Sequence, residues 1–412
     1  MFMSIPIPVR FLTIWVCSSK SNMIENSLKT VLRLNIKHPV FMLHIRLTHS
    51  RRTFIHHKFC LFKFKSQTGS VTSVRTCSSN PSHGRFMRVL KAFVGTFCLG
   101  TVIVGLLASS KIKRRLAGIE NVEDSAWNPI KHYIQFKGVV LPQFTENNAH
   151  KFENFEVRPD DVWVISFPRS ETEWIQEIVF LINSNMDLEK AKTVSIDDRF
   201  PYLEYPTPGL DAITTIPSPR MIKTHLPLKL LPEEIRKSKV IYVARNPKDT
   251  VVSNYHFCKQ LKTFDKNFNS FVKAFIRNKV GYAPWWQHVL EFWKIRDDPN
   301  ILFITYEDLC EDMEGSIRKI AQFLNKELTN NDLNTLLSHC SPENMKNNKQ
   351  VSYKWHLGEE DNEQSDIMKD GVGDWRKYFD DEPNYQINKL VAHKLANSGL
   401  SFKYDKKDKK DR

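Results

Sequence analysis

The stretch DVWVISFPRSETEWIQEIVFLIN runs from Asp161 to Asn183 and contains the pattern of a strand, a turn and a helix. Residues 161–166 form a short apolar run, which is typical of a buried strand. Apolar side chains then recur with helical spacing, at Trp174, Ile175, Ile178, Val179, Leu181 and Ile182. The sequence therefore predicts a buried strand that feeds through a polar turn into an amphipathic helix.

The same order of elements recurs further along the chain. Residues 239–243 predict a strand, 245–249 a turn, and the segment from Thr250 a helix. A third strand is predicted at 301–304, directly before Tyr306. Strands that alternate with helices predict an α/β fold, here a P-loop-like parallel sheet with helices on both faces in a single catalytic domain. Such sheets bind ligands at the carboxyl ends of their strands.

Charge divides the chain unevenly. The net charge is +14, but residues 1–120 hold 19 Lys and Arg against two Glu, which gives +17. The remaining residues hold 41 basic and 44 acidic groups, which gives −3. The basic character therefore belongs to an N-terminal extension, and it does not indicate a nucleic-acid partner for the body. The three cysteines of the body form no CxxC pair and no metal-ligand cluster, so we expect a reduced intracellular domain without a metal.

The N-terminal part predicts two segments. Residues 1–86 are basic and poor in acids, which is compatible with a transit peptide or with an extension that is disordered or untranslated. Within 87–120, the 18 residues from Ala92 to Ser109 carry no charge and form a candidate membrane anchor with a basic flank. The denser positive flank follows the apolar run, so an anchor would leave the catalytic domain in the cytosol. A buried core helix or a cleaved signal is the alternative. The catalytic domain is expected at 121–405 and a charged tail at 406–412.

Polar residues that could bind an anion follow each predicted strand: Arg169, Ser170 and Thr172; Arg245 and Ser253; Tyr306. The first group lies at a helix N-terminus, where backbone N–H groups and the helix dipole favour negative charge. Between the first two groups, Lys223 is followed two residues later by His225. A histidine at this place is either structural or a general base. Since ligands gather at this edge, all of these side chains are predicted to converge there.

Several separated segments, taken together, resemble the cytosolic-type sulfotransferase family over roughly residues 121–404. The family's loop Tyr-Pro-Lys-Ser-Gly-Thr-Thr-Trp is matched by FPRSETEW at 167–174. The other matching segments are KTHLP at 223–227, RNPKD at 245–249 with Ser253 and HF at 256–257, YED at 306–308, and GDW at 373–375. They occur in the family's order, which is far more specific than any one segment.

The resemblance implies transfer of a sulfuryl group from 3′-phosphoadenosine 5′-phosphosulfate to a hydroxyl or amine of a small, hydrophobic acceptor, without a metal. It implies that His225 takes the acceptor's proton and that Arg169 and Lys223 stabilise charge during transfer. By residue, the implied catalytic set is His225, Arg169, Lys223 and Ser253. The implied donor-binding set is Arg169, Ser170, Thr172, Trp174, Arg245, Ser253, Tyr306, Ser341 and Lys369. Aromatic residues that could line the acceptor site, or equally the core, are Phe167, Phe257, Trp285 and Trp286. The oligomeric state is not predicted.

The sequence departs from the family on the donor side. Glu171 replaces a glycine, Glu173 replaces a threonine, and Met368 and Asp370 flank Lys369 where the family has Arg-Lys-Gly. A carboxylate aimed at the donor from about 5 Å costs about 3 kcal/mol at an effective dielectric near 20. Two hypotheses follow: an active enzyme with weaker donor binding, or with glutamates that face solvent; and a degenerate member that binds a ligand or partner with little turnover. A nucleotide kinase is not favoured, because the chain lacks GxxxxGK[ST].

Overall fold

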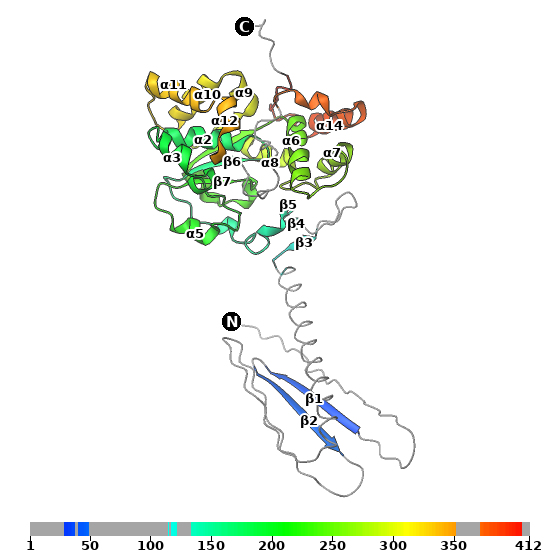
Figure 1. Ribbon diagram of the computed structural model, residues 1–412. Helices are drawn as coiled ribbons and strands as arrows, with labels where there is room; N and C mark the ends of the chain where they lie inside the picture. Colours follow the sequence, from blue (N-terminus) through cyan, green and yellow to red (C-terminus); the bar gives the residue numbers. More distant parts are fainter. Residues whose placement is uncertain are drawn as a thin grey trace. The chain divides into compact units, whose positions relative to one another are not determined.

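The computed structural model describes residues 29–37, 40–48, 114, 117–121, 133–351 and 371–405 (Figure 1). The chain divides into two units, Met1–Thr101 and Val102–Arg412. In the first unit, β1 (Lys29–Lys37) and β2 (Val40–Thr48) pair antiparallel, from Lys29 opposite Thr48 to Lys37 opposite Val40. The sequence did not predict this pair. The nature of the extension at 1–86 stays a prediction.

The second unit contains the remaining elements, in the order β3 to α14. Its strands are β3 (Ile119–Asn121), β4 (Tyr133–Phe136), β5 (Val139–Pro142), β6 (Val162–Ser166), β7 (Met221–Thr224), β8 (Lys239–Ala244) and β9 (Ile301–Thr305). Its α-helices are α2 (Thr172–Asn183), α3 (Leu188–Thr193), α4 (Ile196–Arg199), α5 (Leu210–Thr215), α6 (Pro247–Gln260), α7 (Phe268–Ile276), α8 (Trp285–Lys294), α9 (Tyr306–Glu311), α10 (Met313–Phe323), α11 (Asn330–His339), α12 (Pro342–Asn347) and α14 (Asp381–Lys394).

A four-stranded parallel sheet in the order β7-β6-β8-β9 forms the centre of this unit. Three of its strands are the predicted ones, each within one residue of the expected bounds. The strand β7 was expected only as a short apolar segment before His225. Helices α2, α6 and α9 follow β6, β8 and β9 directly. The predicted α/β class with a parallel sheet is therefore confirmed.

Helices cover both faces of the sheet because successive strand residues point to opposite sides. On one face, Trp163 and Ile165 of β6 lie in a core cluster with residues of α6, α7, α8 and β5. On the other face, Val162 and Val164 of the same strand pack with α2, α10 and α11. The predicted hydrophobic stripe of α2 thus covers one face of its own sheet.

A buried ion pair joins the amino ends of β6 and β7. Arg220 donates from Nε and Nη2 to the two carboxylate oxygens of Asp161, at 2.8 and 2.6 Å. The same Nη2 donates to the carbonyl of Glu156 at 2.8 Å, and the guanidinium lies over Phe155. Neither charged side chain is more than 1% exposed. This fork-shaped pair holds the outer strand β7 to its neighbour β6, at the end of the strands opposite to the polar turns.

The candidate anchor at Ala92–Ser109 lies outside the described residues. Among the residues that the structure does describe, no helix is long and apolar enough to cross a membrane.

Candidate active site

The polar turns that the sequence placed after separate strands meet at one edge of the sheet. The loop after β6 contacts the residues after β8, where Arg169 and Ser253 are 3.1 Å apart. The same loop contacts β7, since His225 hydrogen-bonds to Ser166. Tyr306, which begins α9 after β9, lies against Trp174 of α2 with ring centroids 6.1 Å apart. All four carboxyl ends therefore contribute to one polar site.

His225 is held as a neutral imidazole with a defined tautomer. Its Nδ1 lies 2.8 Å from the backbone oxygen of Ser166, which can only accept, so Nδ1 carries the proton. Nε2 is then the nitrogen whose lone pair can take a proton from a ligand. Burial and, to a smaller extent, the charge of Lys223 lower the pKa of His225 from its usual 6.5 to about 3. The group is therefore neutral at physiological pH, as a general base must be.

We expect the ring of His225 to show no titration between pH 8 and pH 5. Because its pKa is depressed in the folded state, the stability that it contributes is full above pH 6.5 and is lost progressively as the pH falls from 6.5 to about 3. Two-dimensional ¹⁵N NMR of the ring nitrogens measures both the charge state and the Nδ1–H tautomer. A midpoint near 6.5 for His225 would contradict the assignment.

Two further residues fix the backbone of His225. Glu204 accepts the backbone N–H of His225 and the hydroxyl of Thr224, each at 2.7 Å. The Nε2–H of His288, on α8, donates to the backbone oxygen of His225 at 2.9 Å, while its Nδ1 accepts from Tyr242 of β8 at 2.8 Å. Burial raises the pKa of Glu204 to about 7 and lowers that of His288 to about 4. Neither role could be predicted from the sequence, because both depend on long-range contacts.

Arg169 points across the site towards α6. Its Nε donates to the hydroxyl of Ser253 at 3.1 Å, and its guanidinium lies over the ring of Phe257, 5.1 Å from the centroid. Phe257 was expected as a candidate lining residue of the acceptor site. In the structure its ring supports the Arg169 guanidinium. The two predicted catalytic residues Arg169 and Ser253 are joined directly by their hydrogen bond.

Glu171 pairs with Arg245. A carboxylate oxygen of Glu171 lies 3.1 Å from Nη1 of Arg245, and the two side chains are 5% and 0% exposed. The same Nη1 donates to the backbone oxygen of Arg169 at 3.1 Å. Glu171 has φ 62° and ψ 45°, the left-handed region in which a glycine would be expected. That conformation costs a non-glycine residue about 1–2 kcal/mol, which the ion pair and its hydrogen bond offset.

Glu173 pairs with Lys223 in the same manner. Its carboxylate lies 2.7 Å from Nζ of Lys223, and the two side chains are 8% and 1% exposed. The ammonium also lies over the ring of Tyr202, at 5.2 Å from its centroid. The alternative in which the two glutamates face solvent is therefore wrong. Each is buried, because each neutralises a cation that the sequence assigned to the donor or to catalysis.

The aromatic side of the site involves Trp174 and the turn between α11 and α12. Trp174 donates from its indole nitrogen to the backbone oxygen of Cys340 at 2.8 Å. Ser341 is next in the chain, and its hydroxyl accepts from the backbone N–H of Asn344, capping α12. Arg245 lies over the ring of Tyr306 at 4.6 Å. Trp174, Tyr306 and Arg245 therefore form a contiguous wall, and Ser341 adjoins it through Cys340.

The loop after β6 also buries two hydroxyl groups. Thr172 hydrogen-bonds through Oγ1 to the hydroxyl of Ser166 at 2.5 Å. The Ser170 hydroxyl is buried at the start of α2 and has no hydrogen-bond partner among the described residues. A buried polar atom of this kind requires a partner, and an anion at the helix N-terminus would supply one. Lys369, the remaining predicted donor residue, lies outside the described residues, as do Met368 and Asp370.

The C-terminal GDW segment lies beside the turn after β8. The backbone N–H groups of Gly373 and Trp375 donate to the two carboxylate oxygens of Asp249, at 3.0 and 2.9 Å. Lys248 lies over the ring of Trp375 at 3.8 Å. Since Asp249 belongs to the RNPKD segment, two segments that are far apart in the sequence meet at the start of α6.

Two tyrosines flank His225, and the sequence did not single them out. The rings of Tyr202 and Tyr282 lie 5.3 and 5.6 Å from that of His225, and their hydroxyl oxygens are 2.5 Å apart. Tyr282 is positioned by β5, because its backbone N–H donates to Val140 at 2.6 Å. Of the aromatic residues proposed for the acceptor, Phe167 and Trp285 are buried in the core cluster. The ring of Phe167 packs against Phe275 and His288.

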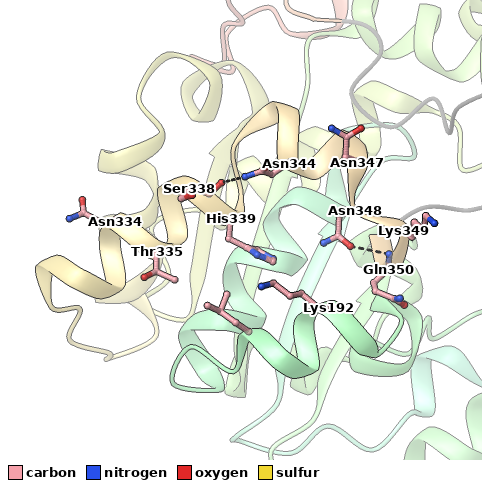
Figure 2. Close-up of a pocket in the computed structure, with 11 residues that line it drawn as sticks. Lys192, Asn334, Thr335, Ser338, His339, Asn344, Asn347, Asn348, Lys349 and Gln350 are labelled. Carbon is pink, nitrogen blue, oxygen red and sulfur yellow. Dashed lines mark hydrogen bonds between the residues drawn. The ribbon is translucent and has the colours of Figure 1, made fainter.

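A separate polar cavity of about 800 Å³ lies between α3, α11 and α12 (Figure 2). Its lining includes Lys192, His339, Asn344 and Asn348. It borders the turn that carries Cys340, but Arg169, Lys223, His225 and Arg245 do not line it. Among the described parts of the chain, no group of three or more His, Cys, Asp or Glu could hold a metal ion.

Comparison with known proteins gives a consistent result. A family model described as the sulfotransferase domain matches residues 159–399. Sulfotransferase 4A1 of Homo sapiens is 37% identical over 276 residues, which cover 66% of this chain and 93% of that protein. Sulfotransferase 1A1 of Canis lupus familiaris is 34% identical over 295 residues, covering 69% and 99%.

Solved structures agree with this. A retinol dehydratase in complex with androsterone and the inactive cofactor PAP is similar with a TM-score of 0.63 and 29% identity, covering 69% of this chain and 97% of that one. Mouse sulfotransferase SULT7A1, complexed with PAP, has a TM-score of 0.54 and 25% identity, covering 65% and 95%. The family model spans more than half of the chain, and its match begins just before β6 and ends after α14. The chain therefore belongs to the sulfotransferase family and is an enzyme of that class.

Proposed function

We propose that the chain transfers a sulfuryl group from 3′-phosphoadenosine 5′-phosphosulfate to a hydroxyl or amine of a small, largely hydrophobic acceptor. The observation that carries the proposal is the state of His225: it is neutral, its Nδ1–H is committed to Ser166, and it lies at the same sheet edge as Lys223 and the N-terminus of α2. A lone-pair nitrogen beside cations at an anion-binding turn is the arrangement that such a transfer requires.

In the proposed step, Nε2 of His225 removes the proton of the acceptor hydroxyl as its oxygen forms a bond to sulfur. The bond between sulfur and the bridging phosphate oxygen breaks, and its electron pair leaves with 3′-phosphoadenosine 5′-phosphate. Lys223 and Arg169 stabilise the negative charge on the sulfuryl oxygens and on the leaving phosphate. No electrons are gained or lost overall, so the step needs no oxidant or reductant.

The donor would be held by the loop after β6 and the aromatic wall. The buried hydroxyl of Ser170 and the N-terminus of α2 fit a phosphate, and Trp174 and Tyr306 fit an adenine ring. From the family resemblance, we assign Arg245 and Ser253 to the 3′-phosphate. Neighbouring structures solved with PAP support a nucleotide of this kind. Their PAP complexes belong to those proteins, and for this chain the donor is an inference.

The acceptor would approach His225 from the side of Tyr202 and Tyr282. Their hydroxyl pair is the polar feature beside the base, and Tyr282 is only 4% exposed. An acceptor hydroxyl that reaches Nε2 would exchange hydrogen bonds with this pair, while its apolar body packs against the rings. This arrangement favours a compact phenol or alcohol.

The first test of the proposal is titration calorimetry of the full-length chain with 3′-phosphoadenosine 5′-phosphate. We expect saturable binding with one site per chain, because the aromatic wall and the helix N-terminus together recognise adenosine and phosphate. The control titrant is 3′-phosphoguanosine 5′-phosphate, which should bind more weakly if the wall is selective for adenine. No binding of either nucleotide at millimolar concentration would contradict the proposed function.

A membrane tether at Ala92–Ser109, with the catalytic domain facing the cytosol, stays a prediction. A carbonate wash of membranes from cells that express the full chain tests it. Release of the chain into the wash would exclude a spanning anchor, whereas retention that disappears when 92–109 is deleted would establish one.

A further inference from the structure

We propose that Glu171 is a built-in counter-ion at the place of the donor's 3′-phosphate, so that this enzyme gains little affinity from that phosphate. The inference rests on the proposed function, because it takes Arg245 and Ser253 as the residues that meet the 3′-phosphate. It assigns to Glu171 the role of setting nucleotide selectivity.

The guanidinium of Arg245 is already engaged by groups of the chain itself. Its Nη1 already bonds the Glu171 carboxylate and the Arg169 carbonyl, both at 3.1 Å. The side chain of Arg245 is fully buried, and that of Glu171 is 5% exposed. A phosphate that approaches this guanidinium must therefore displace the carboxylate or share the cation with it. Since a guanidinium binds carboxylate and phosphate with the same donors, the two are direct competitors.

Several acidic groups surround Arg245. Burial opposes its charge, but the acidic groups that face it raise its pKa overall; they are Glu171, Tyr306, Asp249 and Glu307. Asp249 and Glu307 belong to the RNPKD and YED segments, which match the family. Glu171 is the acidic group at this cation that departs from the family pattern. A doubly charged phosphate placed there would meet repulsion from a carboxylate in a buried environment, where screening is weak.

Ser253, the other proposed ligand of the 3′-phosphate, is also engaged by the chain. Its hydroxyl accepts from Nε of Arg169 at 3.1 Å, and the guanidinium is supported by Phe257. The loop after β6 therefore engages both Ser253 and Arg245, through two residues with positive φ, Arg169 and Glu171. By contrast, the proposed adenine wall consists of two uncharged rings, Trp174 and Tyr306, whose centroids lie 6.1 Å apart. The adenosine and 5′-phosphate subsites are kept, whereas the 3′-phosphate subsite is filled by the chain itself.

The experiment compares 3′-phosphoadenosine 5′-phosphate with adenosine 5′-phosphate, which lacks the 3′-phosphate, by calorimetry on the full-length chain. For the natural sequence we expect the two dissociation constants to differ by less than about tenfold. Glu171→Gln removes the charge and keeps the shape, so the 3′-phosphorylated nucleotide should bind about 10- to 100-fold more tightly, as expected for a restored charge-assisted contact. Because Glu171 is also the N-cap residue of α2, the affinity for adenosine 5′-phosphate should rise less than that for the 3′-phosphorylated nucleotide, so the ratio of the two affinities should increase.

Two further variants make the result specific. Glu173→Gln removes the other buried carboxylate, which pairs with Lys223 and not with Arg245, and it should leave the ratio of the two affinities unchanged. Glu171→Gly suits the left-handed backbone and should reproduce the gain of Glu171→Gln, even if the glutamine variant folds poorly. Circular dichroism of each variant establishes that it is folded before titration.

Two results would overturn the inference in different ways. If the natural chain binds the 3′-phosphorylated nucleotide more than about 100-fold more tightly than adenosine 5′-phosphate, or if neither Glu171 variant changes the ratio, Glu171 does not set selectivity, although the proposed function stands. If no variant binds either nucleotide, the site is not a nucleotide site, and both the inference and the proposed function are wrong.

Discussion

Replacing His225 with alanine is expected to reduce sulfuryl transfer by about 10²- to 10⁴-fold, the usual contribution of a positioned general base. The affinity for 3′-phosphoadenosine 5′-phosphate should stay within about twofold, because the hydrogen bonds that fix this turn use the backbone of His225. The measurements are turnover with a phenolic acceptor and ³⁵S-labelled donor, and calorimetry with the product nucleotide.

The matched control is His150→Ala, a substitution at an exposed position that should leave both quantities unchanged. A parallel loss of turnover and nucleotide affinity in His225→Ala would show that His225 holds the fold of the site and does not act as the base. Unaltered turnover would remove His225 from the mechanism altogether.

The second large effect concerns stability. Replacing Asp161 with alanine is expected to lower the free energy of unfolding by about 3–5 kcal/mol, because it leaves the Arg220 guanidinium charged and buried without its partner. Urea unfolding followed by tryptophan fluorescence measures the change. Activity per folded molecule should be preserved, since the pair lies at the sheet edge opposite to His225.

The chain offers a matched control in Arg236 and Asp298, whose Nη2 and carboxylate oxygen are also 2.6 Å apart. There the arginine side chain is 55% exposed, so Asp298→Ala should cost only about 0–1 kcal/mol. Equal decreases in the free energy of unfolding for Asp161→Ala and Asp298→Ala would mean that burial does not determine how much these ion pairs stabilise the fold.

The location of the site could be predicted because it follows from the sheet. Parallel strands end at one edge, so Arg169, His225, Arg245 and Tyr306 had to gather once the strands were recognised. The spacing of apolar residues predicted the helix α2, which packs against one face of the sheet, but the helix is buried from Thr172 to Ile182 and not only on one side. These conclusions depend on periodicity and chain order, which are local properties of a sequence.

The partners of the charged side chains could not be predicted in the same way. Glu171 and Arg245 are 74 residues apart, and Glu173 and Lys223 are 50 apart. Which cation each glutamate reaches depends on strand order and on the left-handed turn at Glu171. Because the sequence shows only that a carboxylate is present, exposure to solvent and burial against a cation were equally compatible with it.

The hydroxyl pair of Tyr202 and Tyr282 was missed for a related reason. Tyr202 contacts the strand β7 through an isolated bridge to Lys223, and Tyr282 is held by β5. Neither residue belongs to a motif or follows a predicted strand. Only the packing of separate segments around His225 brings the two phenols together.

The chain of hydrogen bonds from Tyr242 through His288 to the backbone of His225 has a kinetic consequence. Tyr242 lies on β8 in the interior of the sheet, so the folded scaffold itself positions His225. If His225 is the base of the proposed reaction, neither proposed substrate has to bind first in order to position it. A compulsory order of substrate binding would then arise from access to the two subsites.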